Sequence, residues 1–150
     1  MSRMKGNCQS GLTLVELVIV IVTLGIIAAV AIPRFGSFSR EARINSTKEE
    51  MIRIKKAIVG DDRLVSGGEY VARGFEGDVG FCPTNLVDLV HKPDSVPSYD
   101  KFTRIGWHGP YIDSAEQKYL NDAWGNPYVY DPTAREIVCT SITPNIELNF

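Results

Sequence analysis

"SGLTLVELVIVIVTLGIIAAVAIPRF", residues 10–35, is an apolar stretch that contains one acid, Glu16, and no other charged residue before Arg34. The 21 residues from Leu12 to Ile32 would form a helix about 30 Å long, which matches the hydrocarbon thickness of a bilayer. The stretch therefore predicts a membrane-spanning helix. An ionised carboxylate at a bilayer centre costs roughly 2.5 to 3.5 kcal/mol, so Glu16 is expected to have a task.

The segment before this stretch is a short basic leader, residues 1–11, with Arg3 and Lys5 and no acid. The positive-inside rule places it in the cytoplasm and everything after Pro33 on the other side of the membrane. A secretory signal cut after Ala31 is an alternative, because small residues flank that position, and it would release a soluble binding domain or enzyme. Glu16 argues against it, since a discarded signal gains nothing from a carboxylate.

The hexapeptide GLTLVE, residues 11–16, resembles the processing motif of the type IV pilin and type II secretion pseudopilin superfamily. The resemblance implies cleavage between Gly11 and Leu12 by a prepilin peptidase, followed by N-methylation of Leu12. It also implies that Gly25 and Pro33 bend the helix that follows.

Glu16 corresponds to the glutamate of that motif. Cleavage would create a cationic amino group on Leu12, and Glu16 follows one helical turn later, where the two charges can neutralise each other in a low dielectric. The resemblance implies that the pairing runs to the N-terminus of a neighbouring subunit. The alternative is an interfacial carboxylate near the positive end of its own helix.

Residues 34–59 change from apolar all round to amphipathic. Residues of one helical face recur at steps of three and four: Ile44, Thr47, Met51, Ile54 and Ile58. This spacing predicts that the helix of residues 12–33 continues to Val59 and ends at Gly60.

Residues 60–150 are expected to form a globular α+β domain on the far side of the membrane. The pattern predicts a short helix over 84–90 and strands over 127–131, 136–142 and 145–150. These strands would form a small antiparallel sheet on the apolar face of the long helix, which is a pilin-like fold.

Two further stretches, GWHGPYI at 106–112 and DAWGNPYVY at 122–130, resemble paired signatures of major type II secretion pseudopilins. Ala123 stands where that family usually has proline. The acidic, glycine-rich calcium loop of the family is missing near residue 150, so no metal site is carried over and no cofactor is expected.

Cys82 and Cys139 would both lie outside the cytoplasm, which favours a disulfide between them. The bond would span 57 positions and restrict the unfolded chain by about 4 kcal/mol. Two buried free thiols are the alternative.

Nothing in the sequence predicts catalysis. His91 and His108 have no metal-binding spacing, and no nucleophile or phosphate motif is present. A net charge of −2 does not favour nucleic-acid binding. The five large aromatics of the two signatures are expected to pack in the core: Trp107, Tyr111, Trp124, Tyr128 and Tyr130.

These features predict a structural subunit of a pseudopilus filament in a type II secretion-like system, anchored in a bacterial inner membrane with its C-terminal domain in the periplasm. The resemblance implies these partners: identical subunits, minor pseudopilins, the prepilin peptidase, the lipid bilayer and an assembly platform with a cytoplasmic ATPase. The pilin of a surface fibre for adhesion, motility or DNA uptake is the alternative with the same architecture.

Overall fold

The computed structural model describes residues 13–61, 63–67, 69–113 and 118–150, with the backbone alone for residues 31–35, 65 and 69–70. The chain divides into two compact units, Met1–Glu41 and Ala42–Phe150.

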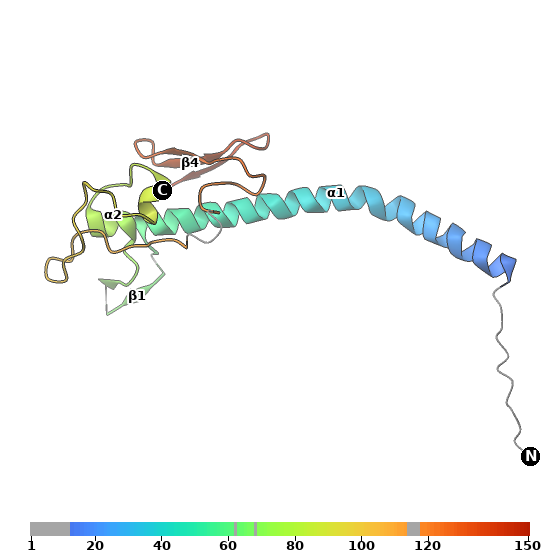
Figure 1. Cartoon of the computed structure of the whole chain (residues 1–150), viewed down its shortest axis with the longest axis horizontal. Coiled ribbons are helices and arrows are strands. Elements are labelled where there is room, and N and C mark those ends of the chain that lie inside the picture. Colours follow the sequence, from blue (N-terminus) through green and yellow to red (C-terminus); the bar gives the residue numbers. More distant parts are fainter. Residues whose placement is uncertain (1–12, 62, 68, 114–117) are drawn as a thin grey trace, which may run out of the picture. The chain divides into compact units, whose positions relative to one another are not determined.

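Helix α1 runs without interruption over Leu14–Val59, 46 residues. The prediction of one continuous helix is confirmed, and Figure 1 shows α1 as the long coiled ribbon. In its first part, large apolar side chains such as Leu14, Ile21 and Val30 are more than half exposed. Among the described residues, no helix reaches the combination of length and hydropathy required of a membrane span. The assignment of residues 12–33 to such a span stays a prediction.

The later part of α1 supplies the core of the second unit. Thr47, Met51, Ile54 and Ile58 are at most 1 % exposed, as their helical spacing predicts, whereas Ile44 is half-buried. Met51, Ile54 and Ile58 pack with residues of the sheet and of the loops in one hydrophobic cluster.

The end of α1 is confirmed at Gly60. Its φ of +94° lies in the left-handed region, and its backbone N–H donates to the Lys56 carbonyl at 2.9 Å. A side chain here would also collide with the Ala72 carbonyl, 2.5 Å from the position of a Cβ. Glycine therefore both stops the helix and allows the chain to pass close by.

The sheet contains β3 (Val129–Asp131), β4 (Glu136–Cys139) and β5 (Ile146–Asn149), in the order β3-β4-β5 with antiparallel pairing. The strands are shorter than predicted. Ile137 lies opposite Tyr130 on one side and Leu148 on the other. This row faces the core, and Figure 1 shows β4 beside the C-terminal part of α1. The predicted α+β fold is confirmed.

The segment between α1 and the sheet has more regular structure than its glycine content predicts. It contains a hairpin, β1 (Val65–Ser66) and β2 (Glu69–Tyr70), then α2 (Gly74–Val79) and the 3-10 helix η1 (Leu86–Leu89). The helix predicted over 84–90 is thus present in shorter form. Helix α2 was not predicted from the sequence, and its Phe75 is fully buried in the core.

Candidate assembly site

The start of α1 is capped by reciprocal hydrogen bonds between Thr13 and Glu16. The Glu16 carboxylate accepts from the backbone N–H and the hydroxyl of Thr13, both at 2.8 Å, and the Glu16 N–H donates to Thr13 Oγ1 at 3.3 Å. This arrangement is a capping box, which satisfies N–H groups that have no partner inside the helix. Thr13 was not among the predicted site residues, although the spacing Thr-x-x-Glu is the sequence signal for this motif.

The other predicted residues of this segment are only partly described. Gly11 and Leu12 lie outside the described residues, and so does the side chain of Pro33. Gly25 lies within α1, and apart from its chain neighbours and the backbone of its own helix no atom lies within 4 Å of the place where its Cβ would be. Cleavage, methylation, the helix bend and the pairing of Glu16 between subunits therefore stay predictions.

The second signature folds into a tight loop around the Asp122 carboxylate, which is 7 % exposed. Its Oδ1 accepts the backbone N–H groups of Trp124 and Asn126 at 2.9 and 3.0 Å, and its Oδ2 accepts from Ser141 Oγ and Cys139 Sγ. Burial alone would raise the pKa of Asp122, but the hydrogen bonds donated by Ser141 and Asn126 outweigh it and hold the pKa below its usual range.

This loop is tied directly to α1. The Ala123 N–H donates to Thr47 Oγ1 at 3.2 Å, and Arg43 Nη1 donates to the Ala123 carbonyl at 3.2 Å. A proline at position 123, as the family usually has, could not donate to Thr47 because it lacks an N–H. The departure from the family pattern therefore has a structural role: it supplies the partner of a buried threonine.

The first signature is built around Gly109. The rings of Trp107 and Tyr111 meet edge to face with centroids 6.0 Å apart, and a Cβ on Gly109 would lie 2.5 Å from the Trp107 ring. Trp107 Nε1 donates to the Asp88 carbonyl at 3.0 Å, which joins the loop to η1. All five aromatics of the two signatures lie in or against the core, so the prediction of core packing is confirmed.

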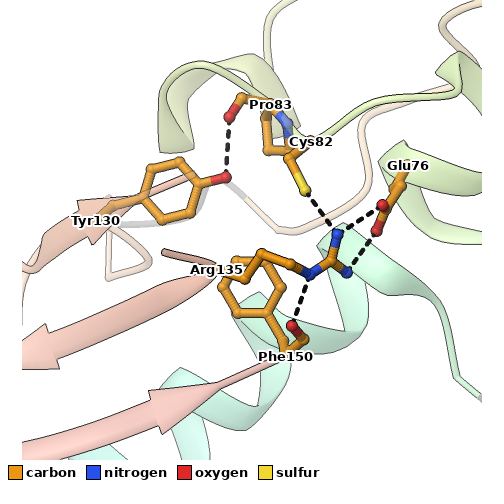
Figure 2. A network of polar contacts seen from close by, with 6 residues as sticks. All are labelled: Glu76, Cys82, Pro83, Tyr130, Arg135 and Phe150. Atoms are coloured by element: carbon orange, nitrogen blue, oxygen red, sulfur yellow. Dashed lines mark hydrogen bonds and ion pairs between the residues drawn. The ribbon is translucent and has the colours of Figure 1, made fainter. Parts of the chain in front are cut away.

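The C-terminal strands are held to α2 by Arg135, which is shown with its partners in Figure 2. Its guanidinium donates to both carboxylate oxygens of Glu76 at 2.8 and 2.9 Å, to Cys82 Sγ at 3.3 Å and to the Phe150 carbonyl at 2.7 Å. The hydrogen bonds from Arg135 lower the pKa of Glu76. Nearby, the Tyr130 hydroxyl donates to the Pro83 carbonyl at 2.9 Å.

The disulfide predicted between Cys82 and Cys139 is wrong for this structure, in which both are free cysteines. Cys82 contacts Arg135, directly before β4, whereas Cys139 is the last residue of β4 and donates to Asp122 at 3.1 Å. The two thiols therefore bind different partners, Arg135 and Asp122, instead of each other. Topology placed both cysteines in one compartment, but it carried no information on their distance.

We expect both thiols to react with iodoacetamide without prior reduction, Cys82 several-fold faster than Cys139. Cys82 is half-buried and Cys139 is 1 % exposed, while burial raises the pKa of both thiols. Peptide mass spectra after timed alkylation of the native protein measure both rates. A pair of unlabelled, disulfide-linked peptides would instead support the bond.

His108, one of the two histidines of the sequence, lies near a carboxylate. The exposed His108 stacks on Tyr99, and its Nδ1 lies 3.9 Å from Asp78 Oδ2. Within the described ranges, no group of three or more His, Cys, Asp or Glu side chains is placed to hold a metal ion. The geometry of the described residues supports packing and capping.

Comparison with known proteins identifies the family of this chain. The chain is 30 % identical over 127 residues to type II secretion system core protein G of Pseudomonas aeruginosa, which covers 85 % of this chain and 76 % of that protein. This chain belongs to the core protein G family. The core protein G of Aeromonas hydrophila is 29 % identical over 125 residues, 83 % of this chain and 74 % of that protein.

Fimbrial proteins match a smaller part of the chain. A fimbrial protein of Pseudomonas aeruginosa is 31 % identical over 86 residues, which cover 55 % of this chain and 54 % of that protein. The chain therefore spans about half the length of the fimbrial relatives that it matches. No family model matches the chain, and no solved structure matches it.

Proposed function

We propose that this protein is a structural subunit of the pseudopilus of a type II secretion-like system. The observation that carries the proposal is the similarity of this chain to core protein G over 85 % of its length. The fold of this chain, a long helix with a small sheet, agrees with it. The fimbrial match extends over only 55 % of the chain, which favours the pseudopilus over a surface fibre.

The first part of α1 supports this role. Its apolar side chains point to all sides and are exposed in a single subunit, for example Val15, Leu24 and Ile27 at 58 to 64 %. A helix that is apolar all round requires an apolar surrounding. The lipid of an inner membrane supplies it before assembly, and the helices of neighbouring subunits supply it in the filament.

In this mechanism a prepilin peptidase removes residues 1–11, and the subunit waits in the membrane with its C-terminal domain in the periplasm. An assembly platform with its cytoplasmic ATPase then extracts it into a filament of identical subunits, to which minor pseudopilins also belong. Glu16 neutralises the amino group of Leu12 on an adjacent subunit. The protein acts by assembly and has no catalytic step of its own.

Intact-mass measurement of the membrane-extracted protein tests this proposal. We expect a chain that begins at methylated Leu12. A chain that begins at Ile32 would mean secretory processing after Ala31 and would contradict the proposal, as would an uncleaved chain in cells that contain a prepilin peptidase.

A further inference from the structure

A groove of about 850 Å³ lies beside the last turns of α1, in the second unit of the chain. Part of its lining is apolar and includes Ile52 and Leu148. Another part is basic: Lys55, Lys56, Arg63 and Arg73. Among the described lining residues there is no acid. The lining of the groove therefore combines apolar and positively charged side chains.

The positive charge of this lining is only partly neutralised within the subunit. Lys56 Nζ lies 2.7 Å from Asp61 Oδ2, and Arg73 Nη1 lies 3.9 Å from Asp78 Oδ1, so both cations form ion pairs. Lys55 Nζ instead donates to the neutral backbone carbonyl of Asn149 at 3.0 Å, so that contact leaves its charge uncompensated. A partner with a carboxylate beside an apolar side chain would fit the groove.

The same chain carries such a surface on α1. Glu49 and Ile52 are three residues apart on one helical face, and both are exposed, Ile52 by 46 %. This face lies away from Met51 and Ile54, which are buried in the core of the subunit. It is therefore available to a second copy.

We propose that the groove of one subunit receives the Glu49 face of α1 from the next subunit, with Glu49 beside Lys55. This inference rests on the proposed function, which brings the helices of neighbouring copies together. Glu49 and Lys55 are six residues apart on α1, which is about 9 Å along a helix. Two parallel copies displaced by that length along their axes place the carboxylate of one level with the amine of the other.

The two surfaces share Ile52 at their border but carry opposite charges, Glu49 on one and Lys55 on the other, so the contact is heterologous. Each copy offers its Glu49 face to one neighbour and its groove to another. A heterologous contact of this kind repeats without closing and generates a helical filament.

Charge reversal and charge exchange test the contact in the full-length protein. Lys55→Glu and Glu49→Lys each place like charges together, and we expect either to lower the yield of sheared filaments by about tenfold. The double variant restores the opposite charges and should regain most of the wild-type yield. Lys101→Glu and Glu147→Lys are matched controls, exposed and outside the groove, and should assemble as wild type does. Wild-type yields for both single variants, or a double variant no better than the singles, would overturn the proposal.

Cross-linking separates this proposal from the proposed function. In a background without native cysteines, copies with Glu49→Cys are co-expressed with copies that carry Lys55→Cys. We expect a disulfide-linked dimer only when both variants are present. Filaments without this dimer would overturn the groove contact and leave the pseudopilus role standing, whereas failure of wild-type protein to assemble would contradict that role itself.

Discussion

Glu16→Leu is expected to leave the removal of residues 1–11 intact and to abolish filament assembly. The substitution makes the membrane segment more apolar, so insertion and processing should survive. In the filament, however, each Leu12 amino group would be buried without its partner. Breaking a buried ion pair in this way costs roughly 3 to 5 kcal/mol, and the loss recurs at every subunit.

The capping box gives Glu16 a second role, because Glu16→Leu also removes the acceptor for the Thr13 N–H. The experiment must separate this capping role from the role of the charge in assembly. Glu16→Gln is the matched variant: its amide oxygen can still accept that hydrogen bond, but it carries no charge. If the charge is what assembly requires, both variants are cleaved and neither forms filaments. If the cap is what matters, Glu16→Gln assembles and only Glu16→Leu fails.

The measurement scores two quantities separately: the mobility shift on cleavage, and the filaments sheared from cells or formed on overexpression. Cleaved Glu16→Leu protein with wild-type filament yield would mean that the carboxylate is only interfacial. The pairing mechanism proposed above would then be wrong.

Asp122→Ala is expected to destabilise the C-terminal unit by about 3 kcal/mol, because it removes a buried charged acceptor and leaves its donors without a partner. Four groups donate to this carboxylate, including the backbone N–H groups of Trp124 and Asn126 and the Ser141 hydroxyl. Urea unfolding of the detergent-extracted full-length protein, followed by tryptophan fluorescence, measures the loss.

Asp131→Ala is the matched control for this substitution. Asp131 also accepts two backbone N–H groups, those of Thr133 and Ala134 at 2.8 and 2.9 Å, but it is exposed. Water can replace its hydrogen bonds, so we expect a loss of about 1 kcal/mol or less. Equal losses for the two variants would show that the buried position of Asp122 contributes nothing.

The lowered pKa of Asp122 also gives its contribution a pH dependence. A carboxyl whose pKa is lower when folded contributes stability above its unfolded value of about 3.9, and that contribution is lost as the pH falls through the folded value. The stability difference between wild type and Asp122→Asn should therefore be constant near neutral pH and shrink below about pH 4. A difference that stays constant down to full protonation would contradict the assigned shift.

The sequence by itself determined the features that depend on local pattern. The steps of three and four from Thr47 to Ile58 identified the buried face of α1, because a helix brings positions with that spacing to one side. Gly60 marked the helix end, since glycine adopts a left-handed backbone without steric cost. The strands and η1 were found with errors of a few residues at their ends, where pairing partners rather than local preference set the limits.

Only the tertiary structure decided which distant side chains meet. Cys82 and Cys139 bind different partners, Arg135 and Asp122, and not each other. In the sequence, Ala123 was only a departure from a family pattern. The structure shows its role, because its N–H donates to Thr47, 76 positions earlier. Likewise, the sequence of α2 has no strong helical signal, and in the structure its Phe75 is buried in the core. Contacts of this kind depend on how the second unit packs on its own part of α1, and no short stretch of residues carries that information.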